Sequence, residues 1–227
     1  MYAGSMAQLP AHLQGASPGE GRLSREVLAR HQRERVLGAV IPVFARRGYR
    51  ETTVDDLLAA GKVGVGNFYT LFEGKEDCFL AAFDWVLGGA RARMEAAYRG
   101  AEDWAEGAVL GLRELIVAIC AEPVSARIVL VEAQAAGPAA TARYEGLLDE
   151  ATKLLRSGRR RGAVLADLPP HFESTAVAGL AYYLQQCLLG SRAPEPGALL
   201  AEVAPLVLGP ILGSAELDRL LAAQPVA

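Results

Sequence analysis

The sequence predicts an all-α protein in which a few short helices precede a larger helical domain. Three observations support this fold class. Apolar residues recur at helical spacing along most of the chain, and Leu, Ala, Glu and Arg dominate these stretches. The alternation of apolar and polar β-branched residues that is typical of strands is absent. Glycines and prolines divide the helical segments from one another.

The N-terminal elements follow from capping and turn residues. Residues 1–23 are rich in Ala, Gly, Pro and Ser, and we expect them to form a flexible tail. The first helix should begin at Ser24, a favourable N-cap residue, and end at Gly48. Pro42 falls inside this helix and removes one backbone hydrogen bond, so it predicts a local bend.

Two shorter helices and one longer helix should follow. Thr53 is the expected N-cap of the second helix, and Asp56 three residues later gives a capping-box pattern. Gly61 should end that helix. A third helix is expected from about 64 to 72, and a fourth from Lys75 to about residue 93.

The remaining chain is predicted to form longer helices separated by prolines and glycines, at residues 103–121, 125–135, 139–161, 171–190, 197–212 and 214–223. The expected organisation has three parts. These are the tail at 1–23, a helix-turn-helix domain at 24–90 with its motif at about 53–72, and a ligand-binding and dimerisation domain at 91–227.

The composition excludes several classes of protein. The chain lacks a run of about eighteen uncharged apolar residues, and its start does not resemble a secretion signal, so we expect a cytoplasmic protein that does not enter a membrane. The three cysteines are far apart and form no CxxC or Cys/His pattern, which disfavours disulfides and a metal site. We expect no cofactor.

Charge is distributed unevenly along the chain. Residues 1–50 contain eight Arg and three Glu, whereas the rest of the chain contains fifteen Lys and Arg against twenty-three Asp and Glu. The net charge of −3 therefore conceals a cationic N-terminal end. DNA binding requires a cationic surface, since its affinity depends on the release of counterions from phosphates.

The stretch from Thr52 to Leu80 carries the functional signal, because two short helices joined by a tight turn form a helix-turn-helix. Over about fifty residues the sequence resembles the N-terminal signature of TetR/AcrR-type transcriptional regulators. The resemblance rests on Phe44, Gly48, Tyr49, Thr52, Thr53, Val54, Leu57, Val63, Gly66, Phe68, Tyr69, Phe72, Lys75 and Glu76.

The resemblance implies a sequence-specific regulator of transcription that binds double-stranded operator DNA as a homodimer. It implies that Thr53, Tyr69 and Lys75 hold phosphates. Bases would be contacted from the third helix and the turn before it, by Lys62, Gly64, Val65, Asn67 and Thr70.

The sequence departs from the family pattern at the tip of the third helix. Gly64 and Val65 occupy positions where the family often has polar residues, so two hydrogen-bond donors are missing. Lys62 occupies the place of a glycine in the turn, and left-handed backbone geometry would be mildly strained at a lysine. The turn could therefore be shifted.

For the C-terminal domain, the resemblance implies a dimer interface and a small-molecule pocket. The two helices at 171–190 and 197–212 should pair with those of a second subunit in a four-helix bundle, through Gly179, Tyr183, Leu184, Cys187, Leu199, Val203, Leu206 and Val207. The effector, a small hydrophobic or mixed-polarity molecule, should contact Trp104, Cys120, Glu132, Tyr144, Tyr182 and Gln186.

Two other classes of function are alternatives to a ligand-released repressor. An enzyme is disfavoured, because the sequence lacks a catalytic triad pattern, a metal cluster and a phosphate loop. The second alternative is a helical adaptor or small-molecule-binding protein of the same fold, in which DNA binding is lost or depends on ligand. The missing donors at Gly64 and Val65 keep this alternative open.

Overall fold

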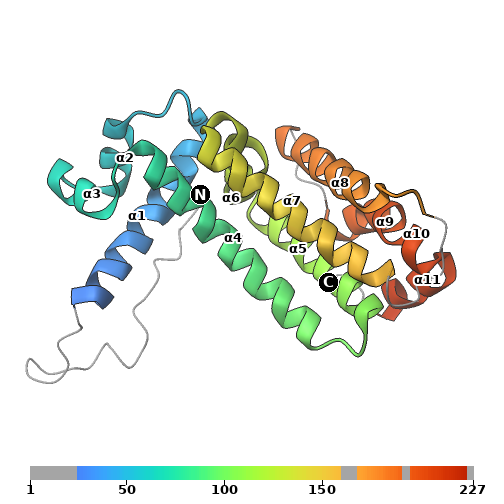
Figure 1. Ribbon diagram of the computed structural model, residues 1–227. Helices are drawn as coiled ribbons and strands as arrows, with labels where there is room; N and C mark the ends of the chain where they lie inside the picture. Colours follow the sequence, from blue (N-terminus) through green and yellow to red (C-terminus); the bar gives the residue numbers. More distant parts are fainter. Residues whose placement is uncertain (1–24, 160–167, 191–194, 224–227) are drawn as a thin grey trace, which may run out of the picture.

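The computed structural model describes residues 25–159, 168–190 and 195–223, and within these residues all regular secondary structure is helical. A small group of helices at the N-terminal end is joined to a larger helical domain by one long helix (Figure 1). The expected tail at 1–23 lies outside the described residues. No helix of the described part combines the length and apolar character needed to cross a membrane.

The small group consists of α1 (Arg25–Arg47), α2 (Val54–Gly61) and α3 (Val65–Leu71), close to the predicted ranges. It folds around buried aromatic rings. Phe79 meets Phe44 edge to face, with ring centroids 5.2 Å apart, and it meets Tyr49 at the same separation. Such contacts add to the hydrophobic stabilisation of this small core.

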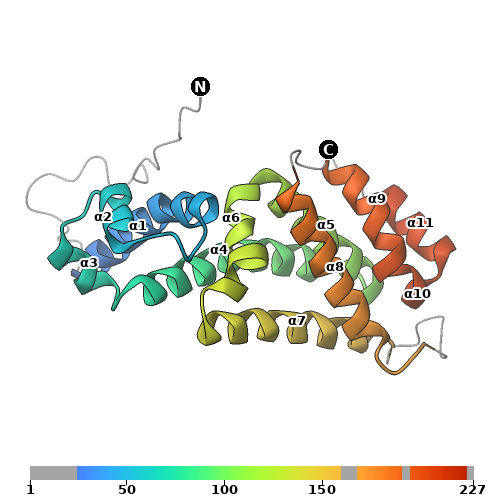
Figure 2. The same ribbon diagram turned by 90° about the horizontal axis from the view of Figure 1, so that it is seen from above.

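The long helix α4 (Lys75–Arg99) joins the two groups. It continues six residues beyond the expected end at residue 93, and it passes through residue 90, where the sequence placed the boundary between domains. Its first turns belong to the core of α1 to α3, while its later turns pack against α5 (Trp104–Ala121) (Figure 2). The same helix therefore contributes to both parts of the structure.

The larger domain contains α5 and α7 (Pro138–Arg159) beside α4, and α8 (Phe172–Leu189) beyond them. The chain then forms α9 (Pro196–Val207), α10 (Gly209–Leu212) and α11 (Ser214–Ala223). The expected single helix at 197–212 is thus divided at Leu208. The division coincides with Pro210, which cannot donate a backbone hydrogen bond.

The segment predicted as one helix at 125–135 is also divided. Pro123 opens α6 (Pro123–Arg127) rather than separating two helices, as proline is tolerated in the first turn. A π-helical turn, η2 (Ile128–Glu132), and a 3₁₀ turn, η3 (Ala133–Ala135), follow. Ile128 and Val129 of this segment are buried in the same core as Phe44 and Phe79. The two domains therefore share part of one hydrophobic core.

Candidate DNA-binding face and ligand cavity

The helix α3 buries one side and exposes the other. Phe68 is fully buried, whereas Val65 and Tyr69 are 58% and 53% exposed. Asn67 and Thr70 are exposed as well. Large apolar side chains on an outer surface are unusual when they are grouped, and they indicate a contact surface. This α3 face is lined by Val65, Gly66, Asn67, Tyr69 and Thr70.

Thr53 caps α2 as the sequence predicts. Its hydroxyl accepts from the Asp56 amide at 3.2 Å, and the Asp56 carboxylate accepts from the Thr53 amide at 2.9 Å, which completes the capping box. The hydrogen bonds that the Asp56 carboxylate accepts from the amide and the hydroxyl of Thr53, with a contribution from Arg47, hold the pKa of Asp56 below its ordinary value. Thr53 was expected to hold a phosphate, but in this structure its amide and its hydroxyl both bond to Asp56.

Replacing Thr53 with alanine should lower the free energy of unfolding by about 1 kcal/mol, because the first turn of α2 loses its cap. Thr70→Ala is the matched control. The Thr70 hydroxyl only donates to the Gly66 carbonyl within α3, at 2.9 Å. Urea denaturation followed by circular dichroism would measure both effects, and equal losses would argue against the capping role.

The turn between α2 and α3 places Lys62 in the left-handed region, with φ 48° and ψ 50°. Its amide lies 3.4 Å from the Ala59 carbonyl and so closes the end of α2. The turn is not displaced to Gly61. Lys62 itself takes the conformation that L-residues disfavour by roughly 1–2 kcal/mol.

Lys62→Gly should therefore raise the free energy of unfolding by about 0.5–1 kcal/mol, since the relief of strain exceeds the extra unfolded-state entropy of glycine. The same change removes an exposed cation beside α3. If Lys62 meets a phosphate, the dependence of DNA affinity on salt should become shallower by about one ion. Lys62→Ala retains the strain and serves as the control. A less stable glycine variant would refute the strain argument.

Lys75 lies at the start of α4, where the sequence analysis expected it to hold a phosphate. Its ammonium instead donates to the carbonyls of Tyr49 and Thr52, both at 3.0 Å. It also lies 4.4 Å from the centre of the Tyr49 ring. A phosphate contact would have to compete with these bonds, so in this structure Lys75 fixes the loop between α1 and α2.

Two arginines of α1 have similar structural roles, which the sequence analysis missed. Arg33 donates to the Leu71 carbonyl at the end of α3, at 2.5 Å, and lies over the Phe72 ring. Arg35 donates to the Gly61 carbonyl at the end of α2, at 2.9 Å. Cations are favourable at helix C-termini, where carbonyls lack partners. Part of the N-terminal positive charge thus holds the helix-turn-helix together.

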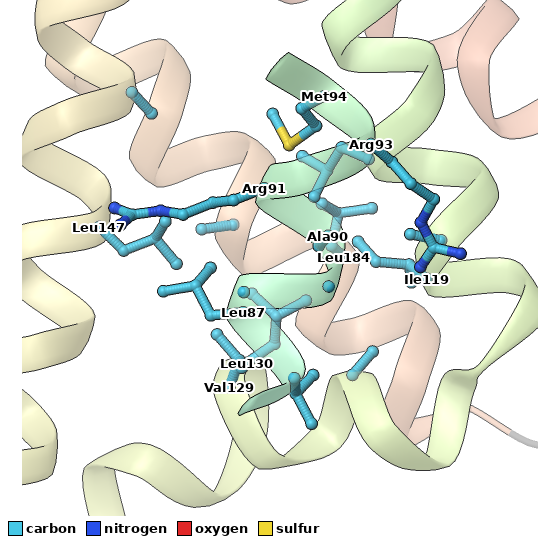
Figure 3. Close-up of a pocket in the computed structure, with 18 of the residues that line it drawn as sticks. Leu87, Ala90, Arg91, Arg93, Met94, Ile119, Val129, Leu130, Leu147 and Leu184 are labelled. Carbon is cyan, nitrogen blue, oxygen red and sulfur yellow. The ribbon is translucent and has the colours of Figure 1, made fainter. Parts of the chain in front are cut away.

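The larger domain contains a cavity of about 890 Å³ between α4, α5, α7, α8 and the α6–η2 segment (Figure 3). Its walls are mainly apolar, with Leu87, Met94, Ile119, Val129, Leu130 and Leu184 among the lining residues. Five charged residues also line it, namely Asp84, Arg91, Arg93, Glu122 and Glu150. Arg91 forms an ion pair with Glu150, so two of these lining residues link α4 to α7.

None of the six residues predicted to bind ligand lines this cavity. Trp104 and Tyr144 are buried in the two hydrophobic cores, and Glu132 accepts a hydrogen bond from the Tyr49 amide. Tyr182 and Gln186 are exposed on α8, and Cys120 is half-buried at the end of α5. The charged groups of the cavity come instead from α4 (Asp84, Arg91 and Arg93), from Glu122 and from α7 (Glu150).

The expected dimer residues divide into two groups. Leu184, Leu199, Val203 and Val207 are buried within the chain, so their side chains offer almost no area to a second subunit. Leu184 lines the cavity instead. Gly179, Tyr183 and Leu206 are exposed, and Cys187 is half-buried.

The exposed group forms an outer face of α8 and α9. Leu206 is 71% exposed, and Tyr182 and Leu189 also lie on the surface of these helices. The hydroxyl of Tyr183 donates to the carboxylate of Glu202, which ties α8 to α9 and raises the pKa of Tyr183 to about 12. Both helices thus carry exposed apolar side chains, which are typical of surfaces through which proteins associate.

Residues 37–82 match the sequence profile of the family described as bacterial regulatory proteins, tetR family. An uncharacterised HTH-type transcriptional regulator of Bacillus subtilis, YerO, is 28% identical over 64 residues, which make up 28% of this chain and only 22% of that relative. The segment at 37–82 includes α2, α3 and the start of α4.

Solved structures resemble a much larger part of the chain. The fatty acid degradation regulator FadR from Bacillus halodurans has a TM-score of 0.67 at 19% identity, covering 78% of this chain and 98% of that one. FadR from Bacillus subtilis, solved with stearoyl-CoA, gives the same values. The ketosteroid regulator KstR2 of Mycobacterium tuberculosis has a TM-score of 0.61 at 20% identity, covering 81% and 96%. Residues 37–82 therefore carry the sequence profile of the tetR family, and most of the chain shares the fold of these solved structures.

Proposed function

We propose that the protein is a DNA-binding transcriptional repressor that acts in the cytoplasm as a homodimer and is released from its operator by an apolar effector. The observation that carries this proposal is the exposed α3 face on a folded helix-turn-helix. In such motifs the second helix enters the major groove, where side chains reach base edges.

The α3 face is suited to a particular kind of contact. Asn67 can bond an adenine edge, Val65 can touch a thymine methyl, and the Tyr69 hydroxyl can reach a phosphate. Gly64 and Gly66 present no side chain, and a Cβ atom at either would meet nothing within 4 Å. The backbone can therefore approach the DNA closely. Exposed cations at Lys62 and Arg50 lie in the loops that flank α2.

Each subunit has one α3 helix, so binding to two half-sites of an operator requires two subunits. We assign the dimer interface to the exposed residues of α8 and α9 described above, and we leave out the four that are buried within the chain. Pairing these helices with those of a second copy would form a four-helix bundle. A two-fold dimer presents its α3 helices to successive major grooves of a near-palindromic site, roughly 34–36 Å apart.

The cavity indicates the nature of the effector. Its volume lies in the usual range for small-molecule sites, and its walls are apolar. Acidic and basic residues are both present at its edge, so charge alone selects neither an anion nor a cation. An effector with a long apolar body fits these walls, and the FadR neighbour that carries stearoyl-CoA supports a ligand of this size. A ligand that prefers one spacing of the two α3 helices would shift the population away from the DNA-bound state.

A second candidate is a regulator that binds DNA only with ligand, or a ligand-binding protein that no longer binds DNA. The observation that favours it is the bare tip of α3, where Gly64 and Val65 provide no side-chain donor. Nothing in the described cavity or on the α3 face forms a catalytic arrangement that would favour an enzyme instead.

The two candidates can be separated by selecting binding sites from fragmented genomic DNA with the purified protein. The enriched fragment is then titrated by fluorescence anisotropy at several salt concentrations, with and without stearoyl-CoA as an apolar probe. Repression by occupancy predicts tight, salt-dependent binding without the probe. Binding only with the probe would favour the second regulator, and enrichment of no sequence under either condition would contradict DNA-binding function.

A further inference from the structure

Helix α1 ends in a way that leaves two backbone groups without helical partners. Gly48 adopts φ 81°, a left-handed conformation, and its amide bonds the Phe44 carbonyl at 2.9 Å. In a continuing α-helix the next bond would join the Tyr49 amide to the Ala45 carbonyl. The turn at Gly48 separates these two groups. Each then needs another partner, because buried backbone groups are almost always paired.

Both partners come from the α6–η2 segment of the larger domain. The Arg127 Nε donates to the Ala45 carbonyl at 3.1 Å, and the Glu132 carboxylate accepts from the Tyr49 amide at 2.8 Å. Glu132 is only 8% exposed, so its bond is shielded from water. Two oppositely charged side chains, five residues apart, thus replace the one bond that α1 loses when it ends.

The same two contacts are connected to the rest of the helix-turn-helix. The Tyr49 carbonyl accepts from the Lys75 ammonium, and that ammonium also bonds the Thr52 carbonyl just before the cap of α2. The position of Tyr49 therefore helps to set where α2 begins, and α3 follows after one short turn. Glu132 thus makes the first contact of a series that runs through Tyr49 and Lys75 to Thr52.

On its other side the α6–η2 segment belongs to the ligand cavity and to the dimer helices. Val129 and Leu130, which lie between Arg127 and Glu132, line the cavity (Figure 3). The second nitrogen of Arg127, Nη1, donates to the Leu188 carbonyl near the end of α8, at 2.7 Å. One arginine therefore joins α1 of the helix-turn-helix to the helix that carries the exposed dimer face.

We propose that Arg127 and Glu132 are positioning residues that fix the orientation of the helix-turn-helix domain against the cavity wall, so that full DNA affinity requires both. Neither residue lies on the α3 face. The inference rests on the proposed DNA-binding function, but its geometric part can be measured without DNA. A shift of Val129 or Leu130 would be transmitted to the helix-turn-helix through the flanking side chains.

The first measurement is the distance between the two helix-turn-helix domains of a dimer. A spin label is attached at Ala59→Cys, an exposed position on α2, with Cys120→Ser and Cys187→Ser removing the half-buried thiols. We expect a narrow distance distribution with Arg127 and Glu132 in place. Arg127→Met, which keeps the apolar stem but removes every donor, and Glu132→Ala should each broaden or shift it.

The second measurement is affinity for the DNA fragment that the unmodified protein enriches. Arg127→Met and Glu132→Ala should each weaken binding at least tenfold while thermal unfolding stays cooperative. Glu132→Gln keeps an acceptor oxygen and should recover affinity to within about threefold. Arg143→Ala is the control, because it removes the contact of Arg143 with Asp84 at 3.2 Å, which also joins α7 to α4 but lies on the surface.

Folded Arg127→Met and Glu132→Ala variants with the original distance distribution would overturn the inference. If the Glu132→Ala variant does not fold, the distance distribution and DNA affinity of Arg127→Met alone test the inference. Failure of the unmodified protein to enrich any DNA would instead overturn the proposed function, and the spin-label distances would still decide the positioning role.

Discussion

Replacing Phe79 with alanine should lower the free energy of unfolding by about 3–5 kcal/mol, which is the usual cost of removing a buried phenylalanine. Its ring is fully buried between Phe44 and Tyr49, in the core that α4 shares with α1. The Ile128 side chain belongs to the same core. The loss should therefore affect both the helix-turn-helix and its attachment to the larger domain.

Trp85→Ala provides the matched control on the same helix. Trp85 is an aromatic residue of α4 that is 46% exposed, so its removal should cost much less. Chemical denaturation followed by circular dichroism would compare the two variants. A Phe79→Ala protein as stable as Trp85→Ala would show that the aromatic cluster does not support the fold.

Replacing Val65 with glutamate should weaken DNA binding on the order of a hundredfold, because a negative charge next to phosphates costs several kcal/mol. Val65 is the first residue of α3 and points to solvent. An acidic residue at a helix N-terminus is favourable, so the fold should not suffer. Loss of binding without loss of stability would then locate the DNA on the α3 face.

Val124→Glu introduces the same change at another exposed valine, in the first turn of α6 in the larger domain. Anisotropy titrations of both variants should show a large effect for Val65→Glu and little for Val124→Glu. Equal effects would mean that net charge, rather than contact at α3, governs binding.

The helix-turn-helix could be predicted from the sequence because its signals are local. The Thr53–Asp56 box, the glycine at position 48 and the spacing of Phe68 and Phe72 each act within a few residues. All of them have the predicted place in the structure. The strain at Lys62 was also foreseen, although the turn stays in place instead of shifting.

The functions of the cations could not be predicted in the same way. Arg33, Arg35 and Lys75 are spaced like residues of a solvent-exposed basic surface, yet all three bond to backbone carbonyls of other segments. These partners lie 23 to 38 residues away in the sequence. Only tertiary packing determines them.

The lining of the cavity and the exposed residues of α8 and α9 could not be predicted for a related reason. Periodicity identifies the apolar side of a helix but not whether that side meets the core, a cavity or another subunit. On α9, Val203 is buried and Leu206 is exposed, although both are apolar. Arg91 and Arg93 also line the cavity. They belong to α4, whose first turns continue directly from the helix-turn-helix.

We propose that a dimer of this chain binds DNA through α3. The most direct test is the salt dependence and stoichiometry of binding to the enriched genomic fragment, measured by anisotropy with the unmodified protein and with Val65→Glu. We expect two subunits per near-palindromic site, an affinity that falls steeply with salt, and a large loss for Val65→Glu. Binding of Val65→Glu with unchanged affinity, or no preference for any sequence, would contradict it.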